Sequence, residues 1–115
     1  MSGPGELSSL LQLCPGAAEK HEAGFRFVLL PQLKVEVGET VKTLDALLAV
    51  TLHSGYSTRL FLTEQISERS TIGGNSANWS NHQILGRNWW TWSWNGVSAD
   101  LPWIQILLAH LRALK

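Results

Sequence analysis

The chain has 115 residues, and its nine lysines and arginines balance nine aspartates and glutamates, so the formal net charge at pH 7 is zero. This length predicts one domain over residues 1–115, with a flexible N-terminus at residues 1–5. Nucleic-acid binding needs surplus basic residues to neutralise phosphates, and so does a polybasic membrane-surface protein. The balanced charge therefore argues against both nucleic acid and membrane as partners.

Cys14 is the only cysteine, which excludes an internal disulfide and zinc sites built from cysteine pairs. The first residues lack the basic start and the apolar stretch of a signal peptide. No apolar run approaches the roughly 18 residues of a membrane span. We expect a cytoplasmic protein with no cofactor and no metal, in which Cys14 is a small buried hydrophobe at a helix end.

The first half of the chain predicts one short helix followed by extended segments. The apolar spacing of residues 6–13 is helical, and Pro15-Gly16 ends that helix. Aromatic and β-branched residues, or apolar alternation, favour strands at three places: residues 25–30, 33–38 and 59–62. Residues 43–52 fit a helix or a strand. Their unbroken period of two favours a strand that pairs with residues 59–62 through a turn at residues 53–56.

The second half predicts a loop, a tryptophan-rich extended region and a helix. Ser67–Asn78 is polar and glycine-containing, which is typical of a long loop, and Gln83–Trp94 is expected to be extended. A turn follows at Asn95-Gly96. A helix then begins near Asp100. Its predicted apolar stripe comprises Ile104, Leu107, Leu108, Leu111 and Leu114.

These elements give an α+β fold class, with an antiparallel β-meander of three to four strands flanked by an N-terminal and a C-terminal helix. Several catalytic signatures are absent from the sequence: it has no glycine-rich phosphate loop, no HExxH and no GxSxG. Only Asp100 follows Glu68 among the carboxylate side chains, so a glycosidase-type acid pair is not expected. An enzyme using His82 and Arg87 is the one catalytic reading that the sequence leaves open.

The element order resembles that of the ubiquitin-conjugating-enzyme family. Asp45 to Val50 leads to Gly55-Tyr56 and then to Arg59-Leu60-Phe61, which is similar to the family's second strand, its Tyr-Pro turn and its third strand. Ser57 stands where the proline is expected, and Asn81-His82 is a weak match to the His-Pro-Asn motif. The stretch from Gly86 to Ser93 resembles a bacterial branch whose members occur beside activating-enzyme-like and peptidase-like partners.

The resemblance implies a ubiquitin-conjugating-like fold over roughly residues 25–115, without the family's chemistry. Its nucleophile is a cysteine, but none lies between Asn78 and Asp100, and thioester transfer needs a thiolate. We therefore expect no thioester enzyme. The expected function is binding of a protein partner, ubiquitin-like or activating-enzyme-like, in a bacterial conjugation-like system. Homo-oligomerisation is a further possibility.

The tryptophans provide the alternative function. Trp90, Trp92, Trp94 and Trp103 are expected to pack between the sheet and the last helix. Trp79 and Trp89 fall on the other face or in the loop, where exposed rings would mark a protein interface or a platform for a small ligand or carbohydrate. The candidate partner- or ligand-binding residues are Trp79, His82, Arg87, Trp89 and Asn95.

Overall fold

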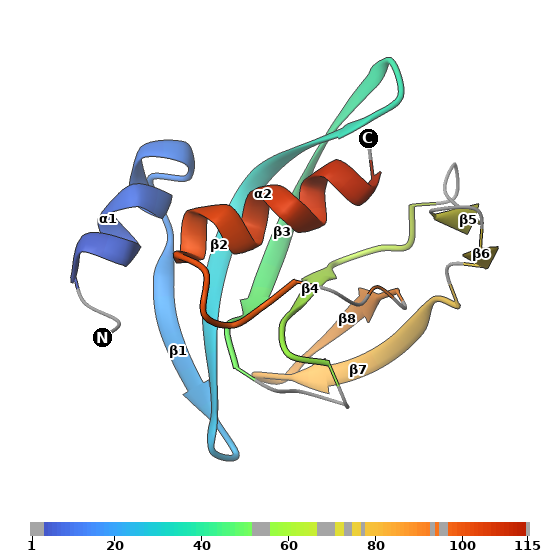
Figure 1. The fold of residues 1–115 in the computed structure, drawn as a ribbon. Helices are drawn as coiled ribbons and strands as arrows, with labels where there is room; N and C mark the ends of the chain where they lie inside the picture. The colour runs from blue at the N-terminus through green and yellow to red at the C-terminus, as the bar shows by residue number, and fades with distance from the viewer. Residues whose placement is uncertain are drawn as a thin grey trace.

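The computed structural model describes residues 4–51, 56–66, 71–72, 75–76, 78–92, 94 and 97–114. Within these residues, six antiparallel strands form one sheet in the order β1-β2-β3-β4-β8-β7, with helices near both chain ends (Figure 1). The helices are α1 (Pro4–Leu13) and α2 (Trp103–Leu114). The strands of this sheet are β1 (Ala18–Glu22), β2 (Phe25–Val37), β3 (Thr40–Ala49), β4 (Arg59–Leu62), β7 (Ser80–Ile84) and β8 (Arg87–Thr91).

This architecture corrects the expected fold class. The main sheet has six strands rather than three or four, whereas a ubiquitin-conjugating fold is helix-rich around a four-stranded sheet. The expected strand at residues 43–52 is confirmed as β3, and it pairs antiparallel with β4. The expected loop Ser67–Asn78 contains two short strands of a separate sheet, β5 (Thr71–Ile72) and β6 (Asn75–Ser76).

Two tight hairpin turns account for the extra strands. Ala23-Gly24 joins β1 to β2, and Leu85-Gly86 joins β7 to β8; all four residues have positive φ angles between 53° and 83°. Two successive positive φ angles suit a two-residue hairpin loop whose twist matches its strands. The sequence predicted neither turn, since Asn-Gly or Asp-Gly is the usual signal. Gln83–Trp94 is therefore a hairpin over most of its length and not one extended segment.

A bulge at Pro31 and Gln32 joins the two predicted strands, residues 25–30 and 33–38, into the single strand β2. Leu30 pairs with Ala46 and Leu33 with Leu44, so β2 has one residue more than β3 between these pairs. The extra residue restores the alternation, and Leu30 and Leu33 both belong to the core on the helical side of the sheet. The Gln32 backbone N–H donates to the Asp45 carboxylate at 2.9 Å. The bulge therefore lets one long strand follow the sheet without moving its apolar side chains to the wrong face.

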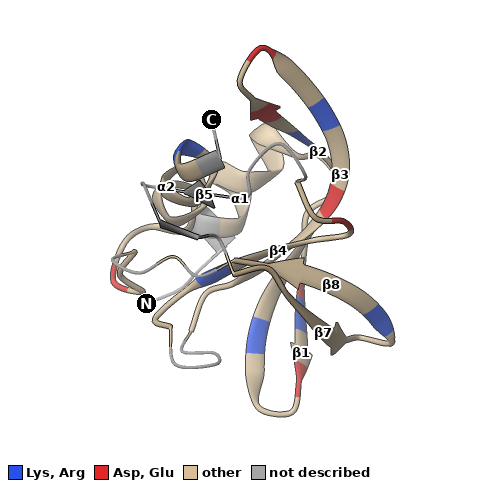
Figure 2. Ribbon diagram, turned by 90° about the vertical axis from the view of Figure 1, so that its right-hand side faces the viewer, with Lys and Arg blue, Asp and Glu red and all other residues tan. Residues whose placement is uncertain are grey.

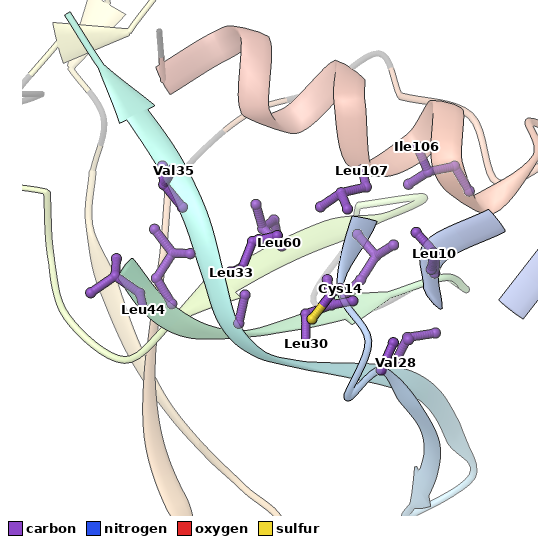
Figure 3. Packing of buried hydrophobic residues seen from close by; sticks show 14 of the residues in the cluster. Leu10, Cys14, Val28, Leu30, Leu33, Val35, Leu44, Leu60, Ile106 and Leu107 are labelled. Carbon is purple, nitrogen blue, oxygen red and sulfur yellow. The ribbon is translucent and has the colours of Figure 1, made fainter. Parts of the chain in front are cut away.

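The helices cover one face of the sheet. Leu10 and Cys14 from the α1 end meet Ile106 and Leu107 of α2 above the apolar side chains of β2 and β4 (Figure 3). Cys14 is buried as expected, and its thiol lies 3.1 Å from the Pro31 carbonyl oxygen. Burial raises the pKa of this thiol, which fits a structural cysteine better than a reactive one.

The opposite face is also apolar, and its core contains no residue from α1 or α2. The second cluster comprises Phe27, Leu47, Ala49, Phe61, Ile84 and Trp89. A flat sheet would expose these side chains, so the sheet curls toward this face and buries them between its own strands (Figure 1). Between the β7–β8 turn and the end of β1, the Leu85 N–H donates to the Glu22 carboxylate. The turn of one hairpin thereby meets the end of β1 at the other edge of the sheet.

Helix α2 has a different rotation from the one predicted. Its buried positions are Trp103, Ile106, Leu107 and His110, whereas the predicted stripe began one residue later. As a result His110 is 1% exposed, and Leu108 is 38% exposed. Among the described residues, no helix is both long enough and apolar enough to cross a bilayer.

The second cluster should be essential for stability. We expect Trp89→Ala to lower the free energy of unfolding by about 3–5 kcal/mol, because the indole is fully buried and its removal leaves a cavity in the core. Arg87→Ala, which uncovers the same ring without removing it, should cost about 1 kcal/mol. Urea denaturation of the three proteins measures both. Equal losses in the two variants would contradict a core role for Trp89.

Candidate functional site

Trp89 and Arg87 lie together, but in a structural arrangement. The Trp89 indole is 0% exposed, and its Nε1–H donates to the Ile84 carbonyl at 2.9 Å. The Arg87 guanidinium lies 4.8 Å from the ring centroid and pairs with Asp45 at 3.2 Å. The expectation of an exposed Trp89 is therefore wrong. The alternation of side chains correctly predicts that Trp89 lies on the face opposite the helices, but the sequence does not reveal that the sheet curls over this face.

Trp79 and His82 lie on opposite faces of the sheet. Trp79 is half-buried on the helical side, where its ring lies 5.5 Å from that of Trp92. His82 pairs directly with Trp89 across the β7–β8 hairpin and so belongs to the concave face. Asn95 lies outside the described residues.

The curl places His82 against a strand that is not its neighbour. Although β8 separates β7 from β4, the His82 ring meets the Phe61 ring edge-on, with centroids 5.5 Å apart. Its Nε2 lies 3.3 Å from the Ser80 hydroxyl. Burial, with a smaller contribution from the positive charge of Arg59, lowers the pKa of His82. This histidine is therefore neutral at pH 7.

Arg59 is the most unusual charged residue of the concave face. It is 5% exposed, and its guanidinium carbon lies 4.2 Å from the Tyr56 ring centroid and 6.0 Å from that of Phe61. One hydrogen bond is made, from Nη2 to the Trp92 carbonyl at 3.2 Å, while the buried Nε has no partner. No described carboxylate pairs with it. Burial lowers the pKa of Arg59, as expected for a cation moved away from water.

A second polar cluster lies beneath α2. The Thr58 hydroxyl donates to the Val97 carbonyl at 2.9 Å and therefore accepts from His110 Nε2–H, also at 2.9 Å. This assigns the neutral tautomer, which leaves the buried His110 Nδ1 without a hydrogen-bond partner. Burial, with a smaller effect of Arg59, lowers the pKa of His110 to about 4. His110 is therefore a buried core histidine.

A hollow on the helical side lies where the two helices meet the outer half of β2. We call it the leucine groove. Its volume is about 220 Å³, and its lining residues are Leu13, Lys34, Glu36, Leu108, Leu111 and Arg112. Leu13 is 48% exposed and Leu108 38%. On the other side of Leu13, a more open hollow of about 420 Å³ continues to Ser9, Gln12 and Ile104.

The comparisons with known proteins add no relative. No family model, no curated protein and no solved structure matches the chain. Among the described residues, no group of three or more His, Cys, Asp or Glu side chains could hold a metal ion.

Sequence reasoning overlooked both the leucine groove and Arg59. The apolar pattern of the last helix predicts Leu108 and Leu111 in the buried stripe, but Trp103, Ile106 and Leu107 form a second stripe of the same spacing, and that stripe is the buried one. For Arg59 the sequence pattern predicts only a position in a strand. Its alternation with Phe61 was the available signal, because it places a cation on a face that is otherwise aromatic.

His110 should make stability depend on pH. Its pKa rises from about 4 in the folded state to 6.5 when the chain unfolds, so between these values the unfolded state binds more protons. The free energy of unfolding should therefore fall as the pH is lowered from 6.5 to 4, by about 3 kcal/mol, and the contribution should be absent above pH 6.5.

Urea denaturation across this pH range measures the effect. His110→Gln keeps an N–H donor for Thr58 but does not titrate, so its stability should fall less over the same interval. His82, whose pKa is also lowered, should leave a residual slope of the same sign. A wild-type profile as flat as that of His110→Gln would contradict the assignment.

Proposed function

We propose that this domain is a protein-binding module whose leucine groove accepts an acidic amphipathic helix of a partner protein. The observation that carries the proposal is the composition of α2. This helix buries a histidine among its core positions and leaves Leu108, two residues earlier, 38% exposed. A helix optimised only for packing would place these two residues the other way round.

The apolar surface continues from one helix to the other. Leu13 at the end of α1 and Leu108 on α2 line the same hollow, and Leu11 is a further exposed leucine of α1. Scattered single leucines on a surface need no explanation, but adjacent leucines lining a concave surface are typical of grooves that receive an amphipathic helix. Anchors spaced one helical turn apart on the partner would fit such a groove.

The charges at the rim favour an acidic partner. Lys34 and Arg112 line the groove, and neither forms an ion pair within the described part of the chain. Glu36 lines the same groove but takes part in another interaction. Two uncommitted cations beside exposed leucines would attract and orient a segment that carries carboxylates next to its apolar anchors.

The alternative of a carbohydrate or ligand platform built on Trp79 and Trp89 has no support from the geometry. Trp89 is fully buried, and Trp79 packs on Trp92 at the other side of the sheet. The resemblance to bacterial ubiquitin-conjugating-like proteins stays a prediction. Because the architecture differs from that fold, a ubiquitin-like or activating-enzyme-like identity for the partner is not part of the proposal.

The groove predicts selective binding of acidic helical peptides. We expect fluorescence anisotropy to show saturable binding of acidic amphipathic peptides with leucines at helical spacing, and weaker binding of peptides in which lysine replaces each acidic residue. Leu108→Glu should weaken the acidic peptides about tenfold or more, because it places a like charge at the apolar contact. Added salt should weaken binding, since the rim charges are exposed.

Leu101→Glu is the matched control. Leu101 precedes α2, is 39% exposed, close to the 38% of Leu108, and does not line the groove, so the same substitution there should leave peptide affinity unchanged. Equal binding of acidic and basic peptides, or binding indifferent to Leu108→Glu, would contradict the proposal. A wild-type dimer that Leu108→Glu dissociates in size-exclusion chromatography with light scattering would assign the groove to a second copy of the chain instead.

A further inference from the structure

We infer that Arg59 forms a binding site for a single carboxylate group on the concave face of the sheet, between Tyr56 and His82. The site is separate from the leucine groove, and none of its residues lines that groove. The inference begins from a charge that the described structure does not balance. A guanidinium that is 5% exposed lies on a face whose nearest side chains are aromatic.

The surroundings of Arg59 lack a counter-ion in the described part of the chain. The sequences of β4, β7 and β8 contain no aspartate or glutamate, and Asp45, the one acidic residue of β3, pairs with Arg87 and accepts from the Gln32 N–H. Acidic residues, red in Figure 2, instead lie on β1, on the β2–β3 hairpin and beyond the end of β4. The aromatic rings of Tyr56 and Phe61 stabilise the cation only in part, because a ring quadrupole offsets less than the loss of hydration. A buried cation without an anion is an arrangement that a bound anion would complete.

The guanidinium is held in place with donors to spare. Its Nη2 is committed to the Trp92 carbonyl, which fixes the orientation of the group. Its Nε is buried without a partner. Its Nη1 also makes no hydrogen bond to the described residues, but unlike Nε it is not fully buried. Nη1 is therefore the donor that a bound acceptor would use, since it has no described protein partner to give up.

The number of charges selects a carboxylate over a phosphate. Among Tyr56, Arg59, Phe61 and His82, the described residues that form this site, Arg59 supplies the positive charge, because burial and the nearby Arg59 charge lower the pKa of His82 and favour its neutral form at pH 7. A carboxylate carries one negative charge and balances one guanidinium. A phosphate monoester carries close to two, so a net negative charge would remain among aromatic side chains at an energetic cost. The half-buried Tyr56 ring beside the guanidinium also offers an apolar wall to the body of an organic acid.

Titration of the full chain with sodium benzoate, followed by NMR, tests the inference. We expect saturable shifts of the Arg59 Nε–H and of the His82 ring resonances, with inorganic phosphate and chloride at equal ionic strength giving no saturable shift. Tyr56→Leu should weaken benzoate more than acetate, since it removes the aromatic wall and keeps the cation. A peptide with a free C-terminal carboxylate, compared with its amidated form, distinguishes a protein terminus from a free acid as the source.

Arg59→Gln should weaken benzoate about tenfold or more, and its backbone amide spectrum shows whether the fold is kept. Arg59→Lys keeps the charge but loses the planar fork, so it should bind at an intermediate level if it is folded. The wild-type titration decides the matter even if both variants unfold. An Arg59 Nε–H signal that does not respond to benzoate, or that responds equally to phosphate, would overturn the inference. Leucine-groove variants such as Leu108→Glu should bind benzoate normally.

Discussion

The structure depends on one constraint: a sheet that is apolar on both faces must bury both, and the two helices cover only one. The central strands β2, β3 and β4 carry large side chains on either side, such as Leu60 and Phe61 in successive positions of β4. Exposure of the second set would sacrifice roughly 1.5–3 kcal/mol for each large side chain. The remaining solution is for the sheet to curl until its own strands enclose the second face.

Several local features serve this curl. The bulge at Gln32 increases the bend of the longest strand while keeping its apolar residues in phase, and Asp45 holds the extra residue. The tight turns at Ala23-Gly24 and Leu85-Gly86 allow both outer hairpins to twist strongly. Arg87 links the central strand β3 to the outer β7–β8 hairpin, because its guanidinium pairs with Asp45 of β3 and covers the ring of Trp89 in β8. Residues far apart in sequence thus support a single bend.

The sequence predicted local structure better than arrangement. Strand β4 was predicted at its observed bounds, since its apolar run stands between clear breaks. The terminal helices were predicted in place, but the rotation of α2 was not, because α2 carries two apolar stripes and periodicity alone does not choose between them. Strand β1 was missed, since a polar five-residue segment before an Ala-Gly turn has no apolar alternation. The expectation of an exposed Trp89 was wrong, because the alternation of β8 does not reveal that the sheet curls over this face, and burial follows from curvature that no short motif encodes.

The two unusual features of the molecule are related by the same constraint. The curl buries Arg59 against aromatic rings on the concave face, while on the other side α2 buries His110 and exposes Leu108. Both arrangements oppose stability, since each places a polar group inside the protein, and in α2 an apolar group lies at the surface as well. The pairing and packing of the rest of the sheet are consistent with stability. Functional sites are expected at the few positions where a residue opposes stability in this way. Because the Arg59 and leucine-groove sites lie on different surfaces and use different chemistry, each would remain a candidate if the other were disproved.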